Sequence, residues 1–541
     1  MRKHLLWLLL FTLLFTGSAS AAVPADETGW QLIVPGIEFS LYQLPDPNNV
    51  FVTRLDRNNP TVTLESSIAN GKLAEGREPV SGMFARYDQA LNFWGGSANP
   101  PSWGMRNQVI VAINGIYFDY NTGAPQGGQV QSGWYVQRYQ NLGGWGGFAW
   151  KLDRSAFISE CLEHLPEKQF VAYPATGVTQ QITHVNLPRE MNELVLYTPQ
   201  YNSRTGTEDA GVEVVVEMTR PTMILPSPAS ATGFVRQIYQ DQGNNLIPFN
   251  SIVLSGRGTA GHLLLENVQI GDEIRISQEI TSYEYDCVTP YNLSWSKTYA
   301  SIQGAFFYLK NGQVREFDDP GAIRRNPRTA IAFNDQYIYY IVVDGRDVYH
   351  SVGMTITELA VFTRDTLGAN WGVALDGGGS STMAINGQVV NNTYCNIYSC
   401  AGNTYLPILT RDGHNGQYTA PAGREGTNSV AITERPVANG MLMVAVQPAA
   451  YSTAFTPGDP VITTSEAELR LGPGTNYDSF TTLPNGTQGT IVQQMNGLDG
   501  VLAKSAYWWY VDFGGVAGWV PEGAIAYQVL GSDISGWFIY H

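Results

Sequence analysis

The sequence predicts an α+β protein: a mixed β-sheet domain with few helices, followed by a small β module near the C-terminal end. Glycine provides 57 of the 541 residues and proline 29, and aromatic residues make up 12%, which is typical of a chain with many strands and turns. Charged residues reach only 14%, and this argues against coiled coils, helical repeats and disorder. At roughly 100–200 residues a domain, the length predicts two to four domains.

The first 21 residues have the pattern of a secretory signal peptide. The basic residues Arg2 and Lys3 precede an apolar stretch, residues 5–15, that is too short to anchor the chain in a bilayer. Ala19–Ala21 fits a cleavage site, and no later apolar stretch reaches membrane length. We therefore expect a secreted or cell-surface protein that does not span a membrane.

The chain is acidic, with 47 aspartate and glutamate residues against 31 lysine and arginine residues and a net charge of −16. It has no basic run that could neutralise the phosphates of DNA or RNA. We therefore expect no nucleic-acid partner.

Four cysteines, Cys161, Cys287, Cys395 and Cys400, leave three disulfide pairings open in an exported protein. Cys395 and Cys400 are close enough in sequence to clip one loop, in which case Cys161 and Cys287 would staple a long insertion. The alternative is that the thiols are free and buried. No histidine lies at ligand spacing around them, so a zinc site is not expected.

Apolar runs mark the buried strands of the main domain. Val109–Ile113 is continuous, apolar and mostly β-branched, and it ends at Asn114-Gly115. Residues 151–230 are less regular and resemble an insertion, after which strand patterning returns at Ile252–Leu254.

The most informative stretch is residues 326–391. The predicted elements are, in order, a strand Arg328–Phe333, a strand Tyr337–Val343, a helix Ile356–Leu367, a strand Trp371–Leu375 and a hairpin Met383–Val390. Thr355 and Glu358 fit a capping box at the start of the helix, and Gly368 fits its end.

The helix predicts how two of these strands relate. A crossover helix normally makes the strands on either side of it parallel and near neighbours. The strands that end at Val343 and Leu375 should then finish at one edge of the sheet. Asp344 and Asp376 would face the same crevice, where open α/β sheets bind ligands.

These motifs resemble, in order, the blocks of the phosphodiester glycosidase family, the N-acetylglucosamine-1-phosphodiester α-N-acetylglucosaminidase-like proteins. Val111–Asp119 resembles the family's Asn-Gly-Gly-x-Phe signature, with Ile116 where the family usually has a second glycine. The other matching blocks are Leu254–Gly258, Gly271-Asp272, Arg328–Ala330, Val343–Arg346, Gly353–Ala360, Leu375–Met383 and Arg435–Asn439. The resemblance implies a glycosidase-like domain over residues 22–445, with insertions near 151–230 and 392–430.

The C-terminal region has a different character. A linker rich in proline, alanine and threonine is expected over residues 446–460, a β module over 461–528 and a short tail over 529–541. Leu469–Thr475, Leu483–Gly486, Trp508 and Gly518–Val520 resemble the bacterial SH3-like domain. This resemblance implies a small β-barrel that binds cell-wall glycopeptide or a partner protein, and so a targeting role.

The family resemblance implies that a sugar-1-phosphodiester is hydrolysed to a free sugar and a phosphomonoester. The phosphate becomes more negative as it leaves, so the site needs fixed positive charge and oriented N–H groups. An oxocarbenium-like sugar also needs a nearby carboxylate or an activated water.

The residues that fit these needs fall into two groups. The catalytic candidates are Asp376, Asp344 and Glu358, and the phosphate- or substrate-binding candidates are Arg328, Arg346, Gly377, Gly378, Gly379, Ser380, Ser381 and Asn114. The sequence does not assign the roles of Asp344 and Asp376. Simpler alternatives are a helix cap for Glu358, a structural ion pair for Arg328 and a turn for Asn114. Consecutive glycines offer no side-chain packing, so close approach of a ligand is favoured there.

The two aspartates could also hold Ca²⁺ or Mg²⁺, and no other cofactor is expected. We therefore expect a secreted hydrolase that cleaves sugar-1-phosphodiesters, similar to GlcNAc-1-phosphodiesters, in a phosphoglycan or cell-wall polysaccharide. The alternatives are a non-catalytic wall- or glycan-binding protein, since a fold does not fix a function, and a peptidoglycan hydrolase.

Overall fold

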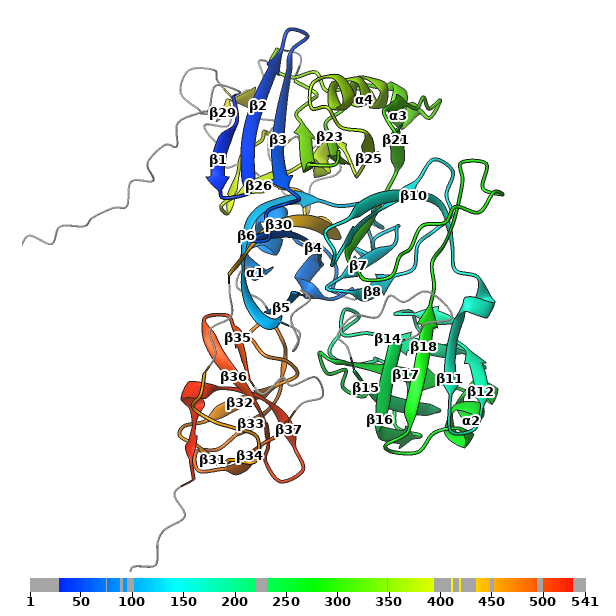
Figure 1. Cartoon of the computed structure of the whole chain (residues 1–541), viewed down its shortest axis with the longest axis vertical. Coiled ribbons are helices and arrows are strands. Elements are labelled where there is room, and N and C mark those ends of the chain that lie inside the picture. Colours follow the sequence, from blue (N-terminus) through cyan, green and yellow to red (C-terminus); the bar gives the residue numbers. More distant parts are fainter. Residues whose placement is uncertain are drawn as a thin grey trace, which may run out of the picture.

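The computed structural model describes residues 29–73, 75–87, 91–94, 102–219, 231–347, 349–393, 410–411, 418–419, 434–447, 452–493 and 500–528. These residues are mostly β-strand with few helices, in agreement with the predicted α+β class (Figure 1). The predicted signal peptide, the Cys395–Cys400 pair and the tail lie outside them. No helix in the described part of the chain has the length and apolar character needed to cross a bilayer.

The first sheet contains the strands predicted to carry the site. Its order is β1 (Gln31–Val34), β2 (Ile37–Leu44), β3 (Asn48–Asp56), β24 (Tyr337–Val343), β23 (Arg328–Phe333), β25 (Trp371–Ala374), β21 (Phe306–Lys310) and β22 (Gln313–Val314). Helix α4 (Ile356–Asp365) packs its apolar residues, among them Leu359 and Phe362, with Val52 and Ile341 of one face. Helix α3 (Pro320–Ile323) lies beside α4 in Figure 1.

One predicted relationship in this sheet is corrected. Strands β24 and β25 run parallel, but they are not adjacent, because β23 lies between them and is antiparallel to both. Strands β23 and β24 are joined by a short turn and pair as a hairpin. Because β23 occupies the position next to β24, the strand that follows α4, β25, pairs with the other edge of β23. The predicted common edge remains: Val343 pairs with Arg328, and the N–H of Leu375 donates to the Thr329 carbonyl at 2.8 Å.

A second sheet packs against the other face of the first. Its order is β27 (Gln388–Val389), β26 (Met383–Ile385), β6 (Ser102–Asn114), β30 (Asn439–Gln447) and β4 (Val62–Ile68), and β5 (Leu91–Trp94) also pairs with β6. The predicted strand 109–113 and the predicted hairpin 383–390 both lie here. Buried residues of both sheets, such as Ile113 and Ile331, form one core, while α1 (Val80–Tyr87) covers the outer face.

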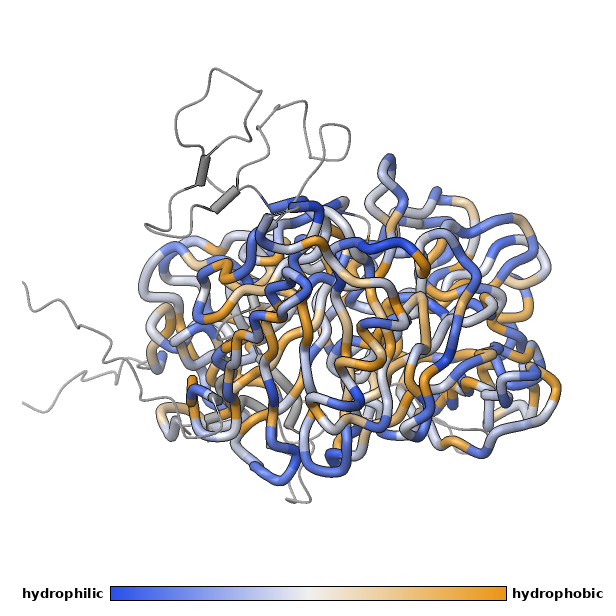
Figure 2. The backbone as a smooth tube through the Cα atoms, turned by 90° about the horizontal axis from the view of Figure 1, so that it is seen from above, coloured by the Kyte–Doolittle hydropathy of each residue, from blue (hydrophilic) through white to orange (hydrophobic). Residues whose placement is uncertain are grey.

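Strand β30 also corrects the start of the predicted linker. Val446 and Gln447 still pair with Asn107 and Arg106 of β6, so the sheet continues two residues into the segment expected to be a linker. Figure 2 shows hydrophobic and hydrophilic stretches alternating along the backbone tube, with several hydrophilic turns at its lower edge.

The chain between β6 and β21 forms two further sheets. One has the order β19 (Thr281–Tyr283), β10 (Ala156–Glu163), β9 (Gly146–Lys151), β20 (Thr298–Gly304), β7 (Gln129–Gln131) and β8 (Trp134–Gln137). The other has the order β12 (Val178–Gln181), β11 (Gln169–Tyr173), β18 (Glu273–Gln278), β16 (Ala231–Gln240), β15 (Val212–Met218), β17 (Ser251–Gly256), β14 (Leu194–Tyr197) and β13 (His184–Val185), with helix α2 (Thr259–Glu266). We call residues 164–283 the insertion; its strands are regular and extend well beyond residue 230.

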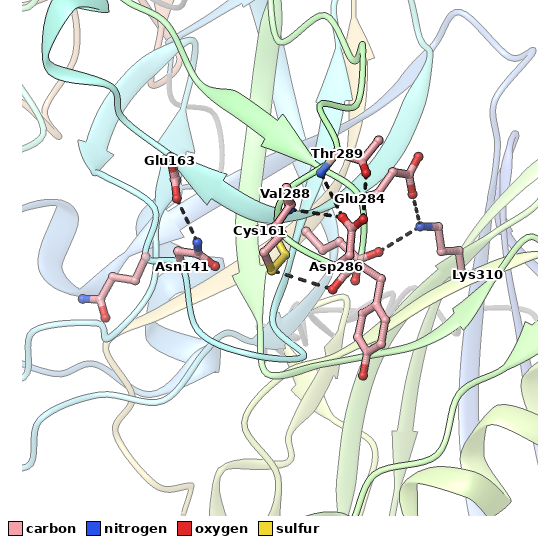
Figure 3. Close-up of a disulfide and its surroundings, with 12 residues drawn as sticks. Asn141, Cys161, Glu163, Glu284, Asp286, Val288, Thr289 and Lys310 are labelled. Atoms are coloured by element: carbon pink, nitrogen blue, oxygen red, sulfur yellow. Dashed lines mark hydrogen bonds and ion pairs between the residues drawn. A yellow bond between two sulfur atoms is a disulfide. The ribbon is translucent and has the colours of Figure 1, made fainter.

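A disulfide joins the two chain segments that border the insertion. Cys161 in β10 is bonded to Cys287, with a Cα–Cα separation of 5.2 Å across 126 residues of sequence, which confirms the predicted pairing (Figure 3). Asp286 holds the neighbouring turn by accepting from the N–H groups of Val288 and Thr289. Lys310 then links this turn to β10 by donating to Glu284 and Glu160.

Residues 452–528, which we call the C-terminal module, form a sheet of their own. Its order is β33 (Ser479–Leu483), β32 (Ala467–Arg470), β37 (Ala517–Pro521), β36 (Ala506–Asp512), β34 (Gln488–Ile491), β31 (Pro460–Thr463) and β38 (Ile525–Tyr527), with β35 (Val501–Ala503) paired to β36. Leu469, Trp509 and Val520 lie in its core. The remaining short elements are η1 (Ala69–Gly71), η2 (Pro166–Lys168), η3 (Gly378–Ser380), η4 (Glu522–Ala524), β28 (Thr410–Arg411) and β29 (Tyr418–Thr419).

Candidate active site

A glycine loop follows β25 at the edge of the first sheet. Asp376 opens it, Gly377 follows, and Gly378–Ser380 form the short helix η3. Only Gly378 of the three has a positive φ, 64°. The other reason for glycine here is close packing: a Cβ atom would lie 2.9 Å from Nη2 of Arg346 at Gly378 and 2.5 Å from Nη2 of Arg435 at Gly379. The absence of side chains therefore lets two guanidinium groups approach the loop backbone.

Asn114, at the end of β6, fixes this loop in place. Its Nδ2 donates to the carbonyl of Asp376 at 2.7 Å, and its Oδ1 accepts from the N–H of Thr382 at 3.1 Å and the hydroxyl of Thr329 at 2.7 Å. The side chain is fully buried. Asn114 thus ties Asp376, at the start of the loop, and Thr382, after its end, to Thr329 of β23. These hydrogen bonds join parts of the protein and give Asn114 a positioning role.

Asp376 is nearly buried, with 7% of the residue exposed. Its Oδ2 accepts from the Ser380 hydroxyl at 2.6 Å, and Nη1 of Arg435 donates to the same hydroxyl oxygen at 3.0 Å. Burial raises the pKa of Asp376 to about 6, against the lowering effects of Ser380, Arg435 and Arg346. A carboxyl group with this pKa exchanges its proton near neutral pH, as general bases and acids do.

Tyr117 is a neighbour of Asp376 that the sequence reasoning did not select. Burial, together with the negative charge of Asp376, raises the pKa of its phenol to about 12. Its ring lies 6.1 Å from that of Trp145. Tyr117 therefore remains a neutral hydroxyl beside the carboxylate; its signal was its place in the Val111–Asp119 motif, three residues after Asn114.

Asp344, at the end of β24, lies against the other end of the loop. Its Oδ1 accepts from Nδ2 of Asn391 at 3.1 Å, and both oxygens accept from the N–H of Asn392 at 3.1 Å. Asn391 also donates to the carbonyl of Ser381 at 3.0 Å. Asn391 thus connects Asp344 to the segment that follows the glycine loop, which Asp376 opens. Asp344 is 4% exposed.

The three arginines nearest the loop have different surroundings. Arg346 is exposed, and its Nη2 donates to Oδ1 of Asn326 at 3.2 Å. Arg435 is 5% exposed and reaches Ser380 as described. Arg328 is also buried, and its Nε and Nη2 donate to the carbonyls of Met354, Gly321 and Arg324. Arg346 and Arg435 therefore border the loop, whereas Arg328 holds α3 and the segment before α4 together behind it.

Arg435 was not selected from the sequence. It lies 59 residues beyond Asp376, on the far side of the expected insertion near 392–430, so no local spacing connects the two. Its signal was the block Arg435–Asn439, which resembles the family's last block and ends where a strand begins. That strand, β30, pairs with β6 and so brings the residue back to the loop.

Glu358 has the structure of a helix cap. Its carboxylate accepts from the N–H of Thr355 at 2.8 Å, while the Thr355 hydroxyl accepts from the N–H of Glu358 at 3.0 Å. The carboxylate also accepts from Nε of Arg325 at 3.0 Å, and this contact lowers its pKa despite partial burial. The capping alternative is confirmed. The Glu358 carboxylate caps the first turn of α4 and pairs with Arg325.

The described residues contain no group of three or more His, Cys, Asp and Glu side chains arranged to hold a metal ion. The oxygens of Asp344 are occupied by N–H donors of Asn391 and Asn392, which a cation would have to displace. These residues do not fit the predicted Ca²⁺ or Mg²⁺ site, and we derive no step through a cation.

Residues 233–402 match the family model of the phosphodiester glycosidases. The matched part is less than half of the chain; it includes Asp344, Asp376 and the glycine loop and ends before Arg435. The match supports a hydrolase that acts on glycosides. No curated protein matches the chain.

Three solved structures are distantly similar. A hypothetical protein of Synechocystis is 16% identical, with a TM-score of 0.46 over 76% of this chain and 62% of that one, so the chain spans less than two thirds of its length. A Burkholderia pseudomallei protein described as exported is 19% identical, with a TM-score of 0.45 over 75% of this chain and 76% of that one. The catalytic domain of zebrafish N-acetylglucosamine-1-phosphodiester alpha-N-acetylglucosaminidase, auto-inhibited by its pro-peptide, is 12% identical, with a TM-score of 0.33 over 79% of this chain and 86% of that one.

Proposed function

We propose that this protein is a secreted hydrolase that cleaves sugar-1-phosphodiesters, similar to GlcNAc-1-phosphodiesters, in cell-wall or extracellular glycans. One observation carries the proposal: a nearly buried carboxylate, Asp376, opens a side-chain-free loop that Arg346 and Arg435 border. A phosphodiester anion needs this combination, since the carboxylate serves the sugar and the guanidinium groups serve the phosphate. The family match over residues 233–402 supports the same chemistry.

In the proposed reaction the oxygen of a water molecule bonds to the anomeric carbon of the sugar. The bond between that carbon and the bridging phosphate oxygen breaks, and its electron pair leaves with the phosphomonoester. One proton of the water passes to a carboxylate and then to solvent. The phosphate gains negative charge as it departs, and nearby guanidinium groups stabilise that charge.

We assign Asp376 to proton transfer, because its pKa of about 6 suits exchange with water near neutral pH. Asp344, which N–H donors hold in place, supplies a fixed negative charge for the oxocarbenium-like sugar. Arg346 and Arg435, with the N–H group of Gly379 and the hydroxyl of Ser381, bind the phosphate. The N–H of Gly378 donates to the Pro327 carbonyl and the Ser380 hydroxyl donates to Asp376, so these two groups hold the loop. Arg328 and Asn114 position the loop, and Glu358 caps α4.

Secretion and wall targeting belong to the same proposal. The leader pattern and the Cys161–Cys287 disulfide suit an oxidising compartment outside the cell. We assign the C-terminal module to an SH3-like targeting role on the resemblance of Leu469–Thr475 and Gly518–Val520. The whole protein would then act where phosphoglycan or cell-wall polysaccharide is attached.

Three substrates test the function against its alternatives. The protein is incubated with a GlcNAc-1-phosphodiester, with a p-nitrophenyl glycoside of the same sugar and with purified cell wall, and released sugar and new reducing ends are measured. We expect release from the phosphodiester, and loss of that release in Asp376→Asn. Wall binding without turnover would favour the non-catalytic alternative, and new reducing ends from peptidoglycan would favour a wall hydrolase.

A further inference from the structure

An exposed tyrosine near the glycine loop has two guanidinium groups over its ring. The Cζ atom of Arg435 is 5.8 Å, and that of Arg77 is 6.0 Å, from the centroid of the Tyr120 ring. Arg77 is also 5.9 Å from the ring centroid of Phe118. Tyr120 is 52% exposed. Since Arg435 also donates to Ser380, a continuous row of contacts runs outward from Asp376 to Arg77.

The backbone fixes this group of side chains from three directions. Asp119 holds the turn around Tyr120 by accepting from the N–H groups of Asn121 and Thr122 at 2.8 Å. A Cβ atom on Gly123 would lie 2.6 Å from the carbonyl carbon of Gly76, so this turn packs directly on the segment that carries Arg77.

The next residue, Glu78, forms a bridge to Val437, two residues after Arg435. The N–H of Glu78 donates to the Val437 carbonyl at 3.0 Å, and the N–H of Val437 donates back at 2.9 Å. Arg77, Tyr120 and Arg435 are therefore held in one fixed arrangement rather than placed on a free loop.

Within the part of the chain that the structure describes, Arg77 has no polar partner that would account for an arginine at this position. It is half-buried, and among the described residues it makes ring contacts but no hydrogen bond or ion pair. The protein as a whole carries a net charge of −16, so an arginine without a carboxylate partner stands out. A guanidinium group placed over an aromatic face, with its N–H donors unused, is suited to bind an anion.

We propose that Arg77 and Tyr120 form a second anion subsite on the leaving-group side of the scissile phosphodiester. The inference rests on the proposed function and extends it. Arg435 lies between Asp376 and Tyr120 in the row of contacts, so a substrate whose sugar meets Asp376 and whose phosphate meets Arg435 directs its leaving group toward Tyr120. The preferred substrate is then a repeating phosphodiester polymer, whose next phosphate reaches Arg77.

Two matched probes test the subsite. The first is α-GlcNAc-1-phosphate esterified to glycerol, and the second is the same compound with a phosphate on the distal glycerol carbon. We expect the wild-type protein to prefer the second probe. Arg77→Gln should lower kcat/KM for the second probe by about tenfold or more, the range for one charge-assisted hydrogen bond, and change the first probe less than twofold. Tyr120→Ala should shift the preference in the same direction.

Arg236→Gln is the matched control, because it removes one positive charge from β16 of the insertion, where Arg236 pairs with Glu217. It should leave the preference between the probes unchanged. Equal loss on both probes in Arg77→Gln, or no loss on either, overturns the subsite while leaving the proposed function intact. If the wild-type protein cleaves neither probe, the proposed function is wrong. Binding of the second probe, measured by calorimetry, then decides the subsite: equal affinity in wild type and Arg77→Gln overturns it.

Discussion

The hydroxyl of Ser380 donates to Oδ2 of Asp376 at 2.6 Å while its oxygen accepts from Nη1 of Arg435 at 3.0 Å. A buried guanidinium group thus acts on a buried carboxylate through one hydroxyl. Burial raises the pKa of Asp376 more than these contacts lower it, and the result is a pKa of about 6. The consequences of this balance can be measured separately in activity and in stability.

Asp376→Asn should abolish activity and stabilise the fold at neutral pH. The folded-state pKa of about 6 lies above the ordinary value of 3.8, so the native state holds a proton that the unfolded state has released. Stability is therefore lost as pH rises from about 4 to 6, and the ionised group costs roughly 2–3 kcal/mol above that range. Urea unfolding should show a more stable variant at pH 7.5 and equal stabilities at pH 4. A variant that is less stable at pH 7.5 contradicts this.

Glu65→Gln separates the stability effect from catalysis. Glu65, in β4, is fully buried, and burial raises its pKa to about 7, although it accepts from the N–H groups of Ser66 and Ser132. Because the pKa of Glu65, like that of Asp376, is higher in the folded state than in the unfolded state, ionisation of Glu65 reduces the free energy of unfolding as pH rises toward 7 and above. We expect the variant to gain roughly 3 kcal/mol at pH 8 and to keep wild-type kcat/KM. Loss of activity in this variant would mean that Glu65 serves the site.

The pH dependence of kcat/KM should follow the protonation of Asp376. Activity should rise as pH increases through about 6 and then level off, because only the ionised carboxylate accepts a proton. The measurement is a pH–rate profile on a GlcNAc-1-phosphodiester from pH 4.5 to 8. A flat profile over this range would remove Asp376 from the proton-transfer step.

Gly379→Ala should impair catalysis through Arg435. The added methyl group would lie 2.5 Å from Nη2 of Arg435, so the guanidinium group must move from Ser380. We expect kcat/KM to fall by about tenfold or more, the loss of one charged hydrogen bond. Gly143→Ala is the control, because a Cβ atom there meets nothing within 4 Å. Equal activities of the two variants would show that the close approach has no catalytic role.

Phe249→Ala should loosen the C-terminal module from the insertion. Phe249 lies 5.5 Å from the ring of Trp519 and 5.8 Å from that of Tyr477, and its N–H donates to the Leu471 carbonyl. Removing a buried phenylalanine ring typically costs about 3–5 kcal/mol. Small-angle scattering should show a larger radius of gyration in the variant but not in Ile270→Ala, a change at an exposed residue of the insertion. Unchanged dimensions would mean that other contacts, such as Lys72 with Asp478, suffice.

The sequence predicted best what depends on neighbouring residues. Thr355 and Glu358 cap the same helix turn, and the capping box was readable because both ends of each hydrogen bond lie within three residues. The strand order was less accessible: a crossover helix fixes direction, but only the pairing of β23 with β24 decides which strand lies between β24 and β25.

The site residues follow the same division. Asp344, Asp376 and the glycines could be selected because strand ends are visible in the sequence. Arg435 and Asn391 could not, since their informative contacts join residues far apart in sequence: Arg435 donates to Ser380, and Asn391 donates to Asp344. The three consecutive glycines predicted close approach of another group to the backbone. The groups that approach Gly378 and Gly379 are the side chains of Arg346 and Arg435, whereas the prediction was a ligand.

Hydrolysis of a GlcNAc-1-phosphate methyl diester in ¹⁸O-labelled water tests the central claim most directly, because the position of the label identifies the bond that breaks. Attack at the anomeric carbon places ¹⁸O in the released sugar and leaves methyl phosphate unlabelled, with no such product from Asp376→Asn. Label in the methyl phosphate, or no turnover by the wild-type protein, would contradict the assignment of a phosphodiester glycosidase.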